Sequence, residues 1–569
     1  MAIFGTSFQI GRSALAAYQS AISVAGQNIA NVGNPDYARQ TGRLSALAAG
    51  ASVAGWAPGA GVNMSALQRH VDEALEGQLR LALGNRRGSS ALYQTLSQVE
   101  TLYNELTDQD LSTGFNELFA SFSTLQTQPQ DATSRNLTIA AADRIAGELH
   151  RLNKGILQQI SDLNDSAEAA VSRINGISKE IAKLNEKIVA ADAQGQAGGN
   201  PLRDRRDGLL RELSEYLDVT VREQEGGSIN VFVGGDPLIT FDRPRELTTQ
   251  RELKNGVEIA SVRFADDGAP VLPRAGQLEA ILTARDTHLA GQLDQLDTLA
   301  KGLIYEVNRV HSSGRGLIGY GALTSNYAVD DPAAVLNSTN AGLPFPLQNG
   351  TFIVHVRNQA TGTEVTRQIR VDLDGVGSDS TLNSLAAALS GVPGLTASVT
   401  SDNRLQISAA AGSEVSFSED SSGALAALGL ATFFDGVNAA DIAVDARVQA
   451  DPRLLAASGN GQIGDGGNAG RLALLGEMAS SLLGNQSVQD FHGAMVNSVS
   501  VAAAGALTGT EAAEAVYSGL IAQREAISGV SLDEEAINLT KFERSYQGAA
   551  RFLTVVENLT DEVLALVGS

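Results

Sequence analysis

Both ends of this 569-residue chain carry an apolar row at heptad spacing, and no other feature limits its fold as strongly. The first row ends at the helix-terminating sequence 31–35, and the second follows a capping box that begins at Ser531. Because such a row needs a partner helix to cover it, we predict that the two ends pair as helices. The residues expected to pack are Leu15, Ile22 and Ile29 against Leu539, Phe542, Tyr546, Leu553, Val556 and Val563.

Two further heptad rows lie inside the chain, at 145–188 and 289–310. For these internal rows, ordinary core helices of a large globular protein explain the pattern equally well. That explanation fits the terminal rows less well. A soluble monomer seldom has long helices with an exposed apolar row at its ends unless they pack against the rest of the protein.

Between the helical blocks the apolar period changes to two, which predicts strands. Hairpins are expected at 219–241, with Gly226-Gly227 at the turn, and at 351–373. The second hairpin is followed by a predicted helix at 381–390 and strands at 396–399 and 404–408. This ββαββ block forms an insert near 335–440.

The expected fold is therefore α+β and mainly α, with paired N- and C-terminal coiled-coil helices, a helix-rich middle domain with some β structure, and a β-rich outer domain. The predicted boundaries are 1–60 with 510–569 for the terminal domain, 61–334 with 441–509 for the middle domain, and 335–440 for the insert.

Composition excludes several classes of function. A net charge of −23 opposes binding to nucleic acid or to an anionic membrane. The absence of cysteine excludes disulfides, iron–sulfur clusters and thiol catalysis. The N-terminus lacks the pattern of a secretory signal. The sequence also contains no run of about 18 apolar residues, which a membrane-spanning helix would need.

The sequence offers no catalytic, cofactor or metal site. The six histidines lie too far apart in sequence for a helical metal motif. The sequence 459–464 matches GxGxxG literally, but no strand–turn–helix unit surrounds it, so we interpret it as a turn. Asp372 and Asp374 resemble the start of a calcium loop that lacks its later ligands, which favours an ordinary acidic turn. We therefore expect no enzyme and no cofactor.

Three segments resemble the flagellar axial proteins, and most closely their hook-associated members. These segments are 28–40 (NIANVGNPDYARQ), 204–219 (DRRDGLLRELSEYLDV) and 528–550, which includes SGVSLDEEAINL. In the first, Asn34 and Asp36 replace the Thr and Gly of the family's turn. A left-handed backbone at Asp36 would cost more than at glycine. By this resemblance Asn28, Asn31, Pro35 and Tyr37 form the turn of the axial motif.

The resemblance implies a structural subunit at the junction between hook and filament, in which paired terminal helices form the inner layer of a tube. It implies self-association in a helical array, contacts with the hook protein and hook-associated protein 3, and a cytoplasmic export chaperone on the C-terminal helix. It also implies an extracellular place on the flagellum, reached by type III export without a cleaved signal peptide.

Two alternatives stay open at the level of sequence. One is another axial protein, such as hook protein or flagellin, against which the C-terminal segment argues. The other is a secreted adhesin or enzyme carried on the insert at 335–440. A glycosidase would fit this second alternative, although aromatics make up only 5% of the chain and saccharide clefts usually contain more.

Overall fold

The computed structural model describes residues 2–48, 59–103, 110–193, 199–254 and 256–567. The chain packs into two compact units. Unit 1 comprises residues 1–94, 163–283 and 504–569, and unit 2 comprises 95–162 and 284–503. Three long helices contribute residues to both units: α2 (Glu73–Tyr103), α4 (Ala132–Ala193) and α12 (Val488–Ser528). The predicted division into three domains stays a prediction.

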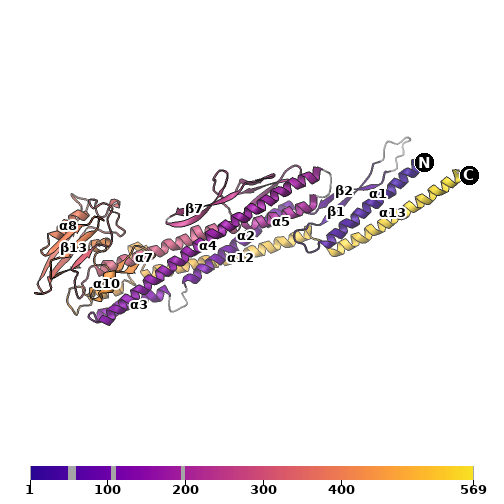
Figure 1. Ribbon diagram of the computed structural model, residues 1–569. Helices are drawn as coiled ribbons and strands as arrows, with labels where there is room; N and C mark the ends of the chain where they lie inside the picture. The colour runs from indigo at the N-terminus through magenta and orange to yellow at the C-terminus, as the bar shows by residue number, and fades with distance from the viewer. Residues whose placement is uncertain (1, 49–58, 104–109, 194–198, 255, 568–569) are drawn as a thin grey trace. The chain divides into compact units, whose positions relative to one another are not determined.

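In unit 1 the first helix, α1 (Ala2–Ala30), and the last, α13 (Leu532–Val567), lie side by side (Figure 1). They are antiparallel, because Asn28 bonds to Glu535 near one end while Gly11 meets Leu553 near the other. A Cβ at Gly11 would lie 2.5 Å from Leu553 Cγ, so glycine permits this close approach. The buried hydrophobic residues of α1 also have small side chains: Ala17, Ala21 and Ala25. The predicted pairing of the terminal helices is confirmed.

A hairpin that the sequence did not predict lies along α1. Its strands β1 (Gln40–Ala46) and β2 (Val62–Arg69) are antiparallel. The amide of Gln40 donates to Asn28 Oδ1 at 3.1 Å, and the amide of Val62 donates to Ser13 Oγ at 3.2 Å. The hairpin thus begins beside the C-terminal end of α1 and runs toward the N-terminal end.

The internal heptad rows belong to core helices. All predicted positions of the 145–188 row are buried in α4, except Leu184, which is half-buried. The 289–310 row follows a π-helical turn at Ala284–Leu289 and continues in α7 (Ala290–His311), with nearly all of its positions buried. The structure thus favours the core-helix explanation for both internal rows.

Three asparagines on α4 fix the β-structure of unit 1. Asn164, Asn175 and Asn185 each donate to and accept from the backbone of a strand region, at 2.7–3.2 Å. Their targets lie in β8 (Val257–Phe264), at the first residue of β7 (Leu247–Lys254), and at Ile229 and Phe241. Because these bonds satisfy buried polar groups on both sides, they hold the strands on the helix at a fixed register.

The remaining elements of unit 1 confirm the first predicted hairpin. The four-stranded antiparallel sheet has the order β3-β4-β5-β6, and Gly226 and Gly227 have positive φ at the predicted turn. The elements are α5 (Asn200–Tyr216), β3 (Val219–Glu223), β4 (Ile229–Val233), β5 (Asp236–Thr240), β6 (Arg243–Pro244) and α6 (Gln277–Thr283).

Unit 2 contains the second predicted hairpin and the strands that follow it. Two antiparallel sheets, β11-β10-β14 and β12-β13-β9, share one apolar core with α8. Strand β14, which the sequence analysis did not assign, pairs with β10. The elements are β9 (Ala322–Thr324), β10 (Gly350–Asn358), β11 (Glu364–Val371), α8 (Leu382–Ser390), β12 (Leu395–Val399), β13 (Leu405–Ala409) and β14 (Ser413–Ser418).

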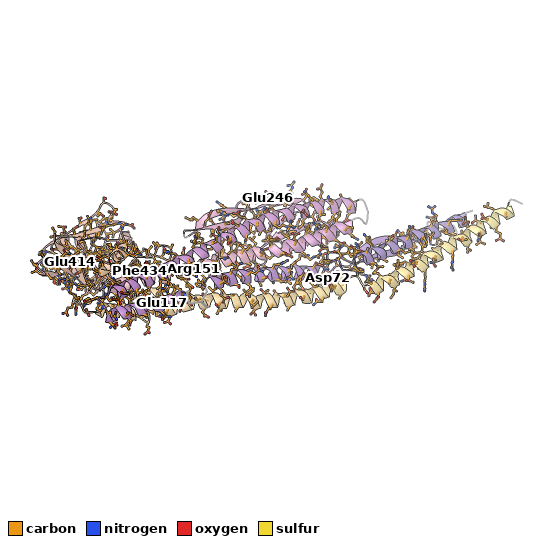
Figure 2. All side chains as sticks on the ribbon, turned by 60° about the horizontal axis from the view of Figure 1, so that its bottom comes forward. Asp72, Glu117, Arg151, Glu246, Glu414 and Phe434 are labelled. Atoms are coloured by element: carbon orange, nitrogen blue, oxygen red, sulfur yellow. The ribbon has the colours of Figure 1, made fainter. Side chains whose placement is uncertain are left out.

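Aromatic rings form a second core in unit 2. Phe433 packs edge-on against Phe434 and Phe122, and its ring lies 5.6 Å from that of His311. Phe434, labelled in Figure 2, is fully buried. The flanking elements are α3 (Leu111–Thr127), α9 (Ala424–Leu428), β15 (Phe434–Asp435), β16 (Ala443–Val444), α10 (Ala446–Ala450) and α11 (Gly467–Leu474). With its long helices and small sheets the chain is α+β and mainly α, as predicted.

Candidate functional site

Asn28, the first predicted residue of the axial-motif turn, is the centre of a buried hydrogen-bond network in unit 1. Its Oδ1 accepts from the Tyr37 hydroxyl at 2.7 Å and from the Gln40 amide at 3.1 Å. Its Nδ2 donates to Gln40 O at 2.8 Å and to Glu535 Oε2 at 3.1 Å. An amide side chain offers two donors and one two-lone-pair acceptor, so all of its capacity is used. Asn28 therefore fixes both the return of the chain after α1 and the start of α13.

The turn after α1 takes its left-handed residue at Gly33, with φ +77°. Asp36 does not adopt a positive φ, so the cost expected for aspartate in place of glycine does not arise. Asn34 Oδ1 accepts from the Asp36 amide at 3.1 Å, which closes the turn through a side chain. Pro35 is exposed, and Asn31 makes a local bond to Gln27 O at 2.9 Å.

Arg39 joins the N-terminal motif to the C-terminal one. Its Nε and Nη2 each lie 2.9 Å from Glu535 Oε1, and its Nη1 lies 2.7 Å from Glu534 Oε2. Its backbone amide donates to Ser528 O at 2.9 Å. Glu535 is only 2% exposed, so its charge is compensated by Arg39 and by the Asn28 amide.

The third motif contacts the same region from α5. Arg211 bonds to Asp36 at 2.7 Å and to the buried Glu76 at 3.2 Å, and Glu76 also accepts from Arg524 Nε at 2.7 Å. A Cβ at Gly208 would lie 3.2 Å from Asp36 Cγ, so glycine leaves room for that side chain.

Asp204, which also belongs to the third motif, lies close enough to the Tyr37 hydroxyl to affect its ionisation. Burial raises the pKa of Tyr37 to about 12, and the carboxylates of Asp204 and Glu535 act in the same direction. Tyr37 therefore stays a neutral donor to Asn28. The three motifs singled out from the sequence meet in one network, although they are hundreds of residues apart in the chain.

A cavity of about 500 Å³ lies beside this network, where α1 and α12 end and α13 begins. Its apolar lining comes from Pro35, Leu79, Tyr517, Ile521 and Val530. Arg39, Arg211 and Arg524 also line it, each held by a carboxylate, and so do the acidic residues Glu525 and Glu534.

The residues predicted to pack between the terminal helices are buried to different degrees. Val556 is buried. Leu15, Ile22, Ile29, Leu539, Phe542 and Leu553 are half-buried, and Tyr546 and Val563 are exposed. Outside the predicted row, α13 also exposes Phe552, Val555 and Leu559. This helix thus has a second apolar face that α1 does not cover.

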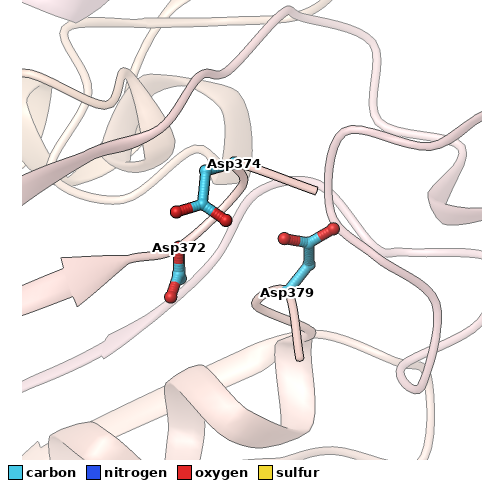
Figure 3. Close-up of side chains that lie close together, drawn as sticks. All are labelled: Asp372, Asp374 and Asp379. Carbon is cyan, nitrogen blue, oxygen red and sulfur yellow. The ribbon is translucent and has the colours of Figure 1, made fainter. Parts of the chain in front are cut away.

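Two segments with possible chemistry behave as turns. In the GxGxxG-like segment, the Asp465 carboxylate accepts from the amides of Gly459 and Asn460 at 2.7 and 3.0 Å, so a side chain of the chain itself occupies the place of a bound anion. The second segment is the acidic turn that begins at Asp372. There the carboxylates of Asp372, Asp374 and Asp379 lie close together in one cluster (Figure 3).

The carboxylates of this cluster bond to neighbouring groups. The Arg370 guanidinium donates to Asp372 at 3.0 Å, while the amides of Val376 and Gly375 donate to Asp374 and Asp379 at 2.9 and 3.0 Å. These are the contacts of an acidic turn. None of the helices in the described part of the chain has both the length and the apolarity needed to cross a membrane.

Comparison with known proteins supports the resemblance found in the motifs. The family model described as the flagellar hook-associated protein FlgK helical domain matches residues 96–323. Flagellar hook-associated protein 1 of Escherichia coli (strain K12) is 26% identical over 97% of this chain and 98% of its own length. The protein of the same name from Bacillus subtilis (strain 168) is 22% identical over 98% of both chains.

A solved structure of the flagellar hook junction protein FlgK from Burkholderia pseudomallei aligns with a TM-score of 0.49 at 16% identity, covering 79% of this chain and 100% of that one. The sequence matches extend over nearly the whole chain, so the resemblance to flagellar hook-associated protein 1 is confirmed. These relatives are structural proteins of the flagellum, which confirms that the chain is not an enzyme.

Proposed function

We propose that this chain is a structural subunit of the bacterial flagellum that forms the junction between hook and filament, and that it polymerises through its paired terminal helices. The observation that supports this most directly is the network around Asn28 and Glu535. It connects all three segments that resemble the axial proteins, and it positions the α1–α13 pair.

The outer surface of the helix pair has the character of a contact between copies. Phe552, Val555, Leu559 and Val563 are between 40% and 55% exposed and follow one side of α13. In α1 the only charged residue among 29 is Arg12, and depletion of charge is typical of interface cores. Covering the four apolar side chains would contribute about 1 kcal/mol each, since each is already half-buried.

A gain of roughly 4 kcal/mol per contact is too small for a stable dimer. It suffices when every subunit makes several such contacts in an array. Because the α13 face and the α1 face differ, the contact is heterologous and gives an open helical assembly, not a closed dimer.

The partners follow from this role. The subunit contacts hook protein on one side and hook-associated protein 3 on the other. Before export, a cytoplasmic chaperone covers the exposed apolar side of α13. The chain leaves the cell by the flagellar type III route without a cleaved signal peptide and works outside it.

The test first removes the C-terminal helix and then substitutes single residues within it. Removal of residues 532–569 should leave cells with hooks but without filaments, and normal filaments in this strain would refute the proposal. Phe552→Asp with Leu559→Asp should give the same phenotype with the α1–α13 pair intact. Gln547→Asp with Asn558→Asp, at two other exposed positions of the same helix, is the charge-matched control and should assemble normally.

A second deletion distinguishes the junction role from an adhesin or enzyme carried on the insert. Removing residues 335–440 should largely preserve filament formation. The adhesin or enzyme alternative would be favoured by two results together. The 335–440 deletion would abolish a measurable adhesive or hydrolytic activity, and the 532–569 deletion would leave filament formation unaffected.

A further inference from the structure

Arg12 is the only charged residue of α1, and it is exposed. Short side chains surround it on the same side of the helix: Gly5, Ala16, Ser20 and Ser23. In the described part of the chain, no carboxylate forms an ion pair with Arg12. If the helix pair polymerises as proposed above, this charge enters a contact between copies. A charge that loses its water there needs a carboxylate partner, and the partner must come from another copy.

The cavity beside the Asn28 network has an excess of negative charge. Five carboxylates line its wall or bond to it, against three guanidinium groups. The carboxylates are Asp36, Glu76, Glu525, Glu534 and Glu535, and the guanidinium groups are Arg39, Arg211 and Arg524. Four of the five carboxylates are paired with these arginines. Among the residues that the structure describes, none forms an ion pair with Glu525.

Two helices end at this cavity. Helix α1 ends at Ala30 and α12 at Ser528, and the residues that follow them, Asn31 and Gly529, both line the cavity. The C-terminal end of a helix has a partial negative charge, which a cation beside it stabilises. Neither α1 nor α12 has a basic residue in its last turn. The helix ends and the Glu525 carboxylate therefore favour a cationic group in the same place.

The cavity is large enough for an arginine side chain. Its volume of about 500 Å³ lies within the range of ligand pockets, roughly 300–1,000 Å³. Pro35, Ile521 and Val530 provide apolar surface that would cover the methylene groups of an arginine. Long basic side chains commonly bury their stems in this way while the charged end meets polar groups. An ion pair inside a cavity is also screened less by water than one on the open surface.

Arg12 cannot reach the cavity of its own copy. From Arg12 to the end of the helix at Ala30, 18 residues of α1 extend about 27 Å, which no side chain spans. The contact of Gly11 with Leu553 confirms this placement, because Leu553 lies far along α13 from its start at Leu532, where the cavity is.

We propose that Arg12 of one copy enters this cavity in a second copy and pairs there with Glu525. This inference rests on the self-assembly proposed above and names one contact within it. The contact is heterologous, because the arginine and the cavity are different surfaces about 27 Å apart along α1. It connects successive subunits along the direction of the terminal helices.

Charge reversal tests this contact in the full-length chain. Arg12→Glu and Glu525→Arg should each leave cells with hooks but few filaments, because each variant brings like charges together. For the contact itself we expect a loss of affinity of roughly thirtyfold or more. The chain with both substitutions has opposite charges again and should restore filaments. Electron microscopy counts the hooks that carry a filament.

Arg551→Glu is the matched control for the rescue. Arg551 is an exposed basic residue of α13, two positions from Leu553, so it lies at the same level of the helix pair as Arg12. Combined with Glu525→Arg, it should not restore filaments. Equal rescue by Arg551→Glu and by Arg12→Glu would overturn the proposal.

Two further measurements separate loss of this contact from loss of export or folding. Each variant chain should appear in the culture medium, and its circular dichroism should match that of the wild type, since both substituted positions are exposed. If Arg12→Glu is not exported, Glu525→Arg alone decides, because it lies far from the N-terminus.

Normal filaments with either single reversal would overturn the proposal, and so would failure of rescue between exported and folded chains. If the 532–569 deletion abolishes filaments while the single reversals do not, this inference fails and the proposed function stands. If the deletion leaves normal filaments, both fail.

Discussion

Replacing Asn28 by alanine removes four hydrogen bonds from a site that is only 1% exposed. The Tyr37 hydroxyl, the Gln40 amide and carbonyl, and one oxygen of Glu535 each lose a partner. At about 1 kcal/mol for each bond lost in a buried site, the loss is roughly 4 kcal/mol. That is a large part of the roughly 5–15 kcal/mol that stabilises a typical domain.

The effect should be local, and amide hydrogen exchange of the full chain measures it locally. Peptides from 28–40 and 528–540 should exchange about a thousandfold faster in Asn28→Ala than in the wild type, since each 1.4 kcal/mol is tenfold. Asn31→Ala is the control, because the Asn31 side chain makes only exposed local bonds, to Gln27 O at 2.9 Å and to Asn34 at 3.5 Å, and a change of less than tenfold is expected.

Asn28→Asp should be at least as damaging as Asn28→Ala, since it keeps the size and the acceptor but brings a second carboxylate against Glu535. If Asn28→Ala and Asn31→Ala changed exchange equally, the network would not be what positions α13, and the reasoning would be refuted.

Three further predictions concern other parts of the chain. Burial lowers the pKa of His311 to about 4, so the unfolded chain binds the proton more readily than the folded chain does. The stability of unit 2 should therefore fall as the pH drops from about 6.5 to 4. Equal urea midpoints at about pH 7 and pH 5 would contradict this. Gly11→Ala should weaken the helix pair because its Cβ meets α13, whereas Gly5→Ala, with open space around it, should only raise helix propensity; thermal circular dichroism compares the two. Asn185→Ala should cost about 2–3 kcal/mol in urea unfolding, and the exposed Gln158→Ala almost nothing.

The heptad rows predicted α1, α4, α7 and α13, because such a row reports burial directly, but α2, α3 and α12 carry no row that was recognised, and α4 begins 13 residues before its row. The rows predicted the exact contact between the terminal helices less well. On an ideal helix, Ile22 lies about 100° around from Ala21, and of these two residues Ala21 is the buried one while Ile22 is half-buried. Large apolar residues show which side of a helix is turned away from water. The row that contacts the partner helix most closely can nevertheless be a neighbouring row of small residues, and the shape of the partner determines which row it is.

The β1–β2 hairpin and the asparagines of α4 were not predicted for a different reason. The strands of the hairpin are only partly buried and lie on α1, so they lack a strict alternation of apolar and polar residues. Asn164 and Asn175 lie on a helix whose apolar row is complete without them. A buried amide on a helix is recognisable only when the strand that it bonds to is known.

The network of the axial motif shows how a departure from a family pattern can be absorbed locally. Aspartate at position 36 would be costly if the backbone there were left-handed, but Gly33 takes that conformation instead. The carboxylate of Asp36 then needs space and a counter-charge. Gly208 supplies the space and Arg211 the charge, and both belong to the third motif. The first and third segments are therefore one structural unit, and Asp36 cannot be understood without α5. By this reasoning Gly208→Ala should disturb the turn after α1, which is 172 residues away in sequence (208 − 36), as much as a change within the turn itself.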